Sequence, residues 1–179
     1  MLRPESTGLI VVDIQGKLAR LVHDSKALIA NCEKLINGSQ VLGLPIIFLE
    51  QNPDKLGGTV DELKSIIESF NAVTKFTFNG CAEPNFINAL QAEKIETWLV
   101  CGIEAHICVY QTAVGLLDLG YNVQLVNDCV SSRSQQDKAL GVSRLKSEGA
   151  IITGVEMCLY ELLQDCRKAE FKPILNLIR

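Results

Sequence analysis

Short apolar runs alternate with longer amphipathic segments along the whole chain. Six runs predict strands, because continuous apolar stretches are typical of parallel strands that helices cover on both faces. These runs span residues 7–13, 45–50, 72–75, 96–103, 121–128 and 150–153. The segments between them carry apolar residues at helical spacing. The alternation therefore predicts a three-layer α/β/α, Rossmann-like fold with a parallel sheet in the middle.

Local signals predict where several of the helices begin and end. We expect helices over 24–42, 84–93, 105–119 and 135–148, and a last one starting near 154. Gly43 and Gly120 suit helix ends, Pro84 suits a first turn and Ser134 suits an N-cap. Two further pairs, Thr59 with Glu62 and Thr153 with Glu156, fit the pattern of a capping box.

The length of 179 residues and the absence of a linker or internal repeat predict a single domain over 1–179. In parallel sheets, ligands bind beyond the carboxyl ends of the strands, where the strand order reverses. Three residues with useful chemistry lie at such ends: Asp13, Lys75 and Cys108. Taken singly, each has an ordinary interpretation as a turn aspartate, a surface lysine and a buried cysteine.

The position of Cys108 favours a catalytic interpretation of all three. We expect it in the first turn of the helix that follows the fourth strand, where free N–H groups and the helix dipole favour an anion. That field, and a nearby Lys75 ammonium, predict a lowered pKa for the Cys108 thiol. Asp13 is a suitable proton acceptor. Together the three residues make an activated nucleophile.

Composition narrows the classes of protein. The net charge is −4 and no run of Lys or Arg occurs, which disfavours a nucleic-acid binder. No apolar stretch is long enough to cross a membrane, and the N-terminus does not resemble a secretion signal. Seven cysteines without a C-x-x-C pair favour a reducing, cytoplasmic compartment. Two histidines, His23 and His106, are too few for a histidine metal site.

Longer motifs resemble the isochorismatase-like cysteine hydrolases, a family that includes nicotinamidases and N-carbamoylsarcosine amidohydrolases. The resemblance covers nearly the whole chain and is carried by TGLIVVDIQ, LEQNPDKLGGTVDEL, GIEAHICVYQTA and LGYNVQLVNDCVSS. It is strongest to the uncharacterised isochorismatase domain-containing subgroup. It implies a six-stranded parallel sheet and an Asp–Lys–Cys triad at Asp13, Lys75 and Cys108.

The resemblance also implies a cis peptide bond between Ile103 and Glu104. Its implied purpose is to aim the backbone N–H groups of Glu104 and Cys108 at one point. Two converging donors of this kind form an oxyanion hole.

The chain departs from the nicotinamidases at their metal site. Where they carry an Asp-x-His pattern after the second strand, this chain has Glu50, Gln51 and Asn52. We therefore predict no metal and no cofactor. Gln51 and Asn52, with Phe76 and His106, are the predicted substrate-pocket residues, although Phe76 also suits the core and His106 also suits a contact outside the pocket.

The predicted function is hydrolysis of a small amide or carbamoyl-type substrate through a thioester on Cys108. A weakly active or inactive oligomeric binding protein of the same fold is the alternative, and a nuclease is a further rival that the acidic charge disfavours. Homo-oligomers are common in the family. The apolar C-terminal stretch around 173–178 suits either a subunit interface or packing on its own subunit.

Overall fold

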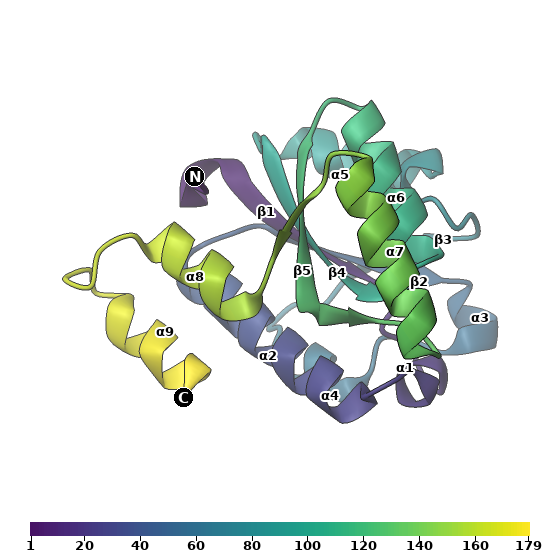
Figure 1. Cartoon of the computed structure of the whole chain (residues 1–179), viewed down its shortest axis with the longest axis horizontal. Helices are drawn as coiled ribbons and strands as arrows, with labels where there is room; N and C mark the ends of the chain where they lie inside the picture. The colour runs from purple at the N-terminus through teal and green to yellow at the C-terminus, as the bar shows by residue number, and fades with distance from the viewer.

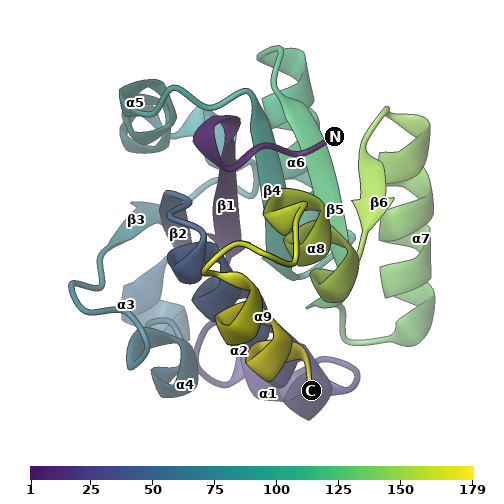
Figure 2. The same ribbon diagram turned by 90° about the vertical axis from the view of Figure 1, so that its left-hand side faces the viewer.

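One six-stranded parallel sheet, with strand order β3-β2-β1-β4-β5-β6, organises the chain. The computed structural model describes all of residues 1–179. Figure 2 shows the six strands side by side in this order. The strands are β1 (Thr7–Val12), β2 (Ile46–Gln51), β3 (Ala72–Lys75), β4 (Thr97–Ile103), β5 (Asn122–Ser131) and β6 (Ile151–Thr153).

These strands confirm the six predicted from the apolar runs. Every residue of β1 is buried, as are all but the first residue of β4, because helices cover both faces of the sheet. The clearest difference is at β5, which continues beyond the predicted end at 128 to Ser131. The register of β5 against β4 shifts between Val100 and Gly102, and this irregularity accommodates the longer strand.

Two layers of helices sandwich the sheet (Figure 1). One layer packs α2, α4, α8 and α9 against Leu9 and Val11 of β1, and the other packs α5, α6 and α7 against Ile10 and Val12. The helices are α1 (Leu18–Leu21), α2 (Ser25–Val41), α3 (Pro53–Leu56), α4 (Asp61–Lys64), α5 (Pro84–Ala92), α6 (Cys108–Asp118), α7 (Gln135–Ser147), α8 (Val155–Leu163) and α9 (Phe171–Ile178), with 3-10 turns at Pro4–Ser6 and Gly80–Ala82.

Some predicted helix ends are correct and the two capping boxes are wrong. Ser134 caps α7 by accepting a hydrogen bond from the Asp137 N–H at 3.1 Å. Thr59 does not cap α4, because its hydroxyl donates to Glu50 instead. At α8 the cap comes from Asp128, whose carboxylate accepts from the Val155 N–H, while Thr153 remains in β6. In each case a carboxylate from elsewhere in the chain, Glu50 or Asp128, accepts the hydrogen bond that the sequence pattern assigned to a residue of the capping box.

The C-terminal stretch packs on its own subunit. Residues Phe171–Ile178 form α9, and the side chain of Ile174 is fully buried against the core that α2 and α8 share. Figure 1 shows α9 beside α2. None of the helices has the length and apolar character needed to cross a membrane.

Gly102 allows β4 to pass very close to β1 just before the chain reaches the candidate site. Its φ is +125°, and a Cβ atom at this position would lie 2.0 Å from the carbonyl oxygen of Val12. Val12 precedes Asp13, and Gly102 precedes Ile103 and Glu104. The absence of a side chain at Gly102 is therefore a condition for bringing these two segments together.

We expect Gly102→Ala to lower the free energy of unfolding by about 2–5 kcal/mol, because it adds backbone strain to a steric clash in the sheet. Gly43→Ala is the matched control: Gly43 also has a positive φ, +71°, but nothing lies within 4 Å of the position of its Cβ. It should cost only about 1 kcal/mol from the backbone. Urea unfolding of both variants measures the difference, and equal losses would contradict the role of the close approach.

Candidate active site

Asp13 lies at the topological switch point of the sheet. It follows β1, the strand from which the chain moves to β2 on one side and later to β4 on the other. Its backbone has a φ of 51° and is held by a hydrogen bond from its N–H to the Leu49 carbonyl at 3.1 Å. Only 1% of the residue is exposed. A buried carboxylate at this edge requires a partner.

The partner is Lys75, which ends β3 and is fully buried. Its Nζ donates to Asp13 Oδ2 at 2.6 Å, to Gln51 Oε1 at 2.7 Å and to the Thr77 carbonyl at 3.3 Å. The ammonium group thus has an acceptor for each of its three protons, which is the condition under which a buried lysine stays charged.

Cys108 completes the group. It is the first residue of α6, directly after the segment that leaves β4, and 8% of it is exposed. Its thiol is close enough to Asp13 and Lys75 for the charges of both to shift its pKa. Asp13 Oδ1, the carboxylate oxygen that Lys75 does not use, is buried and has no hydrogen-bond partner. This oxygen is the natural acceptor for the thiol proton. The structure therefore brings together the three residues that the sequence singled out.

The pKa values of Cys108 and Asp13 differ from the expectation based on the sequence. Burial and the negative charge of Asp13 together raise the pKa of the Cys108 thiol to about 12, against the opposing effect of Lys75. Burial also raises the pKa of Asp13, while the Lys75 ammonium partly offsets this. The predicted lowering of the Cys108 pKa is wrong, because loss of water around the sulfur and the facing carboxylate outweigh the cationic partners.

Consequently the resting site holds a thiol and an ion pair. Thiolate formation has to coincide with transfer of the proton to Asp13, whose raised pKa makes it a stronger base than an exposed aspartate.

Glu104 lies one turn before Cys108. The peptide bond between Ile103 and Glu104 is cis, at the position that the family resemblance implies. The Glu104 carbonyl accepts from the N–H groups of Ile107 and Val109, which closes a tight turn into α6. The N–H groups of Glu104 and Cys108 have no acceptor within the chain.

Gln15, which the sequence analysis missed, supports the site by holding the backbone of a neighbouring residue. Gln15 is fully buried; its Oε1 accepts from the Gln51 N–H at 2.6 Å, and its Nε2 donates to the carbonyls of Gln51 and Gly57. It thereby fixes the backbone of Gln51, whose side chain binds Lys75. The only feature of the sequence that pointed to Gln15 is its position two residues after Asp13, in VVDIQ. That position does not reveal its contact with Gln51.

The four predicted pocket residues have different surroundings. Gln51 binds Lys75 and donates to the Phe76 carbonyl, so it is a support of the triad. Phe76 is 67% exposed, which excludes the core alternative. Asn52 has a φ of 37° and is the N-cap residue directly before α3. His106 is half-buried with Nδ1 2.9 Å from Ser132 Oγ. Substrate contact by these residues stays a prediction.

The residues present do not suit a metal. No group of three or more His, Cys, Asp or Glu side chains is arranged to hold an ion. Glu50, at the position of the nicotinamidase metal pattern, instead accepts hydrogen bonds from the N–H and the hydroxyl of Thr59. The sulfur atoms of Cys32, Cys101, Cys129 and Cys158 belong to the buried core.

A groove of about 670 Å³ lies away from this site. It runs between α2 and α7 beside the end of β5, and its walls include Asn31, Asp128 and Lys138. None of the triad residues lines it. Because a nucleophile, a base and a cation meet only at the switch point, that point is the candidate active site.

Comparison with known proteins agrees with this geometry. The model of the isochorismatase domain matches residues 7–157, a range that contains all three triad positions. Isochorismatase domain-containing protein 2 of Xenopus laevis is 33% identical over 174 residues, covering 97% of this chain and 83% of the relative. The secreted isochorismatase effector Isc1 of Phytophthora sojae is 31% identical, with 98% and 86% covered.

Solved structures show the same fold. A structure titled MAR1 ribonuclease from Caenorhabditis elegans superimposes with a TM-score of 0.93 at 34% identity, covering 99% of this chain and 91% of that one. The Escherichia coli YcaC protein, described as an octameric hydrolase of unknown specificity, has a TM-score of 0.92 at 21% identity, with 98% and 89% covered. Because the domain match spans most of the chain and includes the switch point, this protein belongs to the isochorismatase family and has the fold of its hydrolases.

Proposed function

We propose that this protein hydrolyses a small amide or carbamoyl-type substrate at the C–N bond, with Cys108 as nucleophile. The observation that carries the proposal is the buried Oδ1 of Asp13, which has no hydrogen-bond partner, while Oδ2 is held by the Lys75 ammonium and the Asp13 charge acts on the Cys108 thiol. One carboxylate is thus oriented by a cation and poised to accept one proton. This arrangement matches the requirements of an activated cysteine.

The reaction follows from the ionisation states. As the Cys108 sulfur bonds to the substrate carbonyl carbon, its proton passes to Asp13 and the carbonyl oxygen becomes an oxyanion. When the C–N bond breaks, Asp13 gives this proton to the leaving nitrogen, and a thioester remains on Cys108. Water then attacks the thioester as Asp13 takes a water proton; the sulfur leaves and regains the proton, and the acid product is released.

We propose the N–H groups of Glu104 and Cys108 as the oxyanion hole. Neither of them donates to an acceptor within the chain. Donors at the start of α6 also add the positive end of the helix dipole. Lys75 contributes by keeping Asp13 in place and by balancing the charge of the thiolate as it forms.

Ribonuclease activity is the second candidate, because the structure that carries this title is 34% identical. The net charge of −4 and the scattered Lys and Arg residues count against a phosphate-binding surface. A third outcome is the weakly active binding protein of the same fold. These candidates are separated by the substrate assay below.

We also propose a homo-oligomer in a cytoplasm-like, reducing compartment. The E. coli YcaC neighbour is described as octameric, although its 21% identity supports the fold alone. All seven cysteines are free thiols, and five of them are buried. Light scattering of the purified protein under reducing conditions tests the assembly; a molar mass of 19.6 kDa, that of one chain, would contradict it.

We expect Cys108→Ala to lower the turnover of small amides by about 10³-fold or more, because removal of the nucleophile abolishes the thioester route. Release of ammonia or amine from a panel of linear amides and ureido compounds measures it. Cys166→Ala is the matched control, since Cys166 is the exposed cysteine far from the triad in sequence, and it should retain activity.

The same proteins are then given a single-stranded RNA. RNA cleavage by the wild type without amide turnover would replace the proposal by the ribonuclease candidate. Inactivity of the wild type on every compound would favour the binding protein. Equal amide turnover by Cys108→Ala and the wild type would remove Cys108 from the mechanism.

We expect kcat/KM to fall as the pH is lowered through the pKa of Asp13, because a protonated Asp13 accepts no proton. The midpoint should lie above the ordinary aspartate value of 3.8, since burial raises this pKa. No rise is expected between pH 7 and pH 10, because the Cys108 thiol ionises only at about 12. Measuring kcat/KM across this pH range, with substrate saturation checked at each pH, tests both the fall at low pH and the absence of a rise at high pH.

Alkylation of the free protein gives an independent check. Without substrate, iodoacetamide at pH 6–7 should label the exposed Cys166 faster than Cys108, as followed by peptide mass spectrometry. Preferential labelling of Cys108 at pH 6 would show a thiolate in the resting site and would contradict the raised pKa.

A further inference from the structure

The outer edge of β5 loses its strand partner after Val126, because β6 is three residues long and pairs no further. Beyond Thr153 the chain turns away into α8, and the Asp128 carboxylate fixes this turn by accepting from the Val155 N–H. No strand therefore lies beside residues 127–131 on this side of the sheet. An edge of this kind presents backbone N–H and C=O groups to a further strand.

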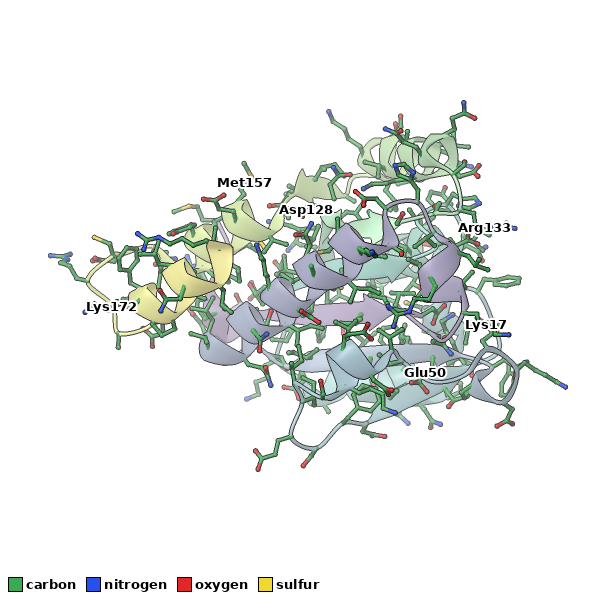
Figure 3. All side chains as sticks on the ribbon, turned by 90° about the horizontal axis from the view of Figure 1, so that it is seen from below. Lys17, Glu50, Asp128, Arg133, Met157 and Lys172 are labelled. Carbon is green, nitrogen blue, oxygen red and sulfur yellow. The ribbon has the colours of Figure 1, made fainter.

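The groove of about 670 Å³ between α2 and α7 lies along this edge. Residues of the edge line it, and its walls are one face of each helix, with residues at helical spacing over 24–31 in α2 and 135–146 in α7. In Figure 3, Asp128 lies on the side of α2 that faces α7. Asn31 of the α2 wall donates to the Asp128 carbonyl at 3.0 Å, so this edge already accepts a hydrogen bond from a group in the groove.

The two walls of the groove differ in charge. On the α7 wall, Lys138 is half-buried and Lys146 is exposed, and neither forms a salt bridge within the chain. The α2 wall carries Asp24 and the uncharged Ala27 and Leu28. A ligand that suits both walls is therefore acidic toward α7, and small or apolar toward α2.

An extended peptide beside β5 would satisfy both walls at once. Its side chains would point alternately to α2 and α7, because these helices cover opposite faces of the sheet. Lys138 and Lys146 are eight residues apart in α7, which is about 12 Å along a helix. Two residues four positions apart in a strand share a face and are separated by about 13 Å. The spacing of the lysines thus matches acidic residues at positions i and i+4 of a strand.

We propose that this groove binds an extended peptide of a partner protein, added as a strand to the edge of β5, with two acidic residues four positions apart on the face toward α7. Main-chain hydrogen bonds of the added strand supply affinity, and its alternate side chains supply specificity. The inference is independent of the proposed hydrolysis, since no triad residue lines the groove. A second copy of this chain and a small anion are the alternative occupants that the experiments separate.

The probe is acetyl-Glu-Val-Thr-Ala-Glu-Val-amide, in which both Glu residues lie on one face of a strand. Its matched control, acetyl-Glu-Val-Thr-Glu-Ala-Val-amide, has the same composition but places the two Glu residues on opposite faces. In isothermal titration calorimetry the wild type should bind the probe about 3- to 10-fold more tightly, as one additional ion pair at a partly exposed site allows. Equal binding of the two peptides, or no binding of either, would overturn the proposal.

Lys138→Gln and Lys146→Gln should each weaken binding of the probe by about 3- to 10-fold and reduce its advantage over the control peptide. Lys172→Gln is the matched control for charge, because Lys172 is an exposed cation of α9 outside the groove, and it should bind the probe as the wild type does. Equal losses in all three variants would replace the proposal by a general attraction between the peptide and surface cations.

Ala27→Trp tests the groove itself, since Ala27 is exposed on the α2 wall and an indole there occupies the space of the added strand. Ala30→Trp is the matched control, at an exposed position of α2 that does not line the groove. The first variant should weaken binding of the probe by about 10-fold or more, and the second should not. Unchanged binding by Ala27→Trp, with folding of both variants verified by circular dichroism, would contradict the proposal.

Two further measurements identify the occupant. The probe should slow amide hydrogen exchange in residues 127–131, because an added strand pairs the free edge. Inorganic phosphate that displaces the probe, combined with unchanged exchange in this segment, would assign the lysines to a small anion and overturn the proposal. A lower molar mass of Ala27→Trp than of the wild type in light scattering would overturn it in favour of a second copy of this chain.

Discussion

The buried ion pair between Asp13 and Lys75 is the interaction on which the site depends. The two residues come from β1 and β3, which are not neighbours in the sheet, and β2 lies between them. Gln51 at the end of β2 bridges the gap by accepting from Lys75. Each of these polar groups is costly to bury alone, and their mutual hydrogen bonds offset that cost. Removal of either charge would leave the other buried without a counterion.

The same burial determines the ionisation state of the Cys108 thiol. A sulfur in contact with a carboxylate and shielded from water does not rest as a thiolate, even at the start of a helix. The site instead holds a proton on the Cys108 sulfur, with the Asp13 carboxyl group as the proposed acceptor. Reaction then requires that substrate binding and proton transfer occur together. In the proposed mechanism, Cys108 would be protected from oxidation and alkylation until a carbonyl compound occupies the site, because a thiol is less reactive than a thiolate.

Glu104 links this centre to the surface. Its backbone belongs to the proposed oxyanion hole, and its side chain leads outward to Arg133. The family resemblance implies chemistry common to many members, but it leaves the substrate open. The rim residues, which differ among members of a family, are where substrate choice is expected to reside.

The sequence by itself determined the layers and the strands, because apolar runs and helical spacing reflect burial that every parallel sheet imposes. It also singled out Asp13, Lys75 and Cys108 as candidates for the site, since strand ends are recognisable and the motifs around them are specific. Only the tertiary structure decided the rest. The Gln15 contact, the caps at α4 and α8, the Glu104–Arg133 pair and the raised thiol pKa all depend on groups distant in sequence. Burial and distance act between such groups, and local sequence patterns do not record them.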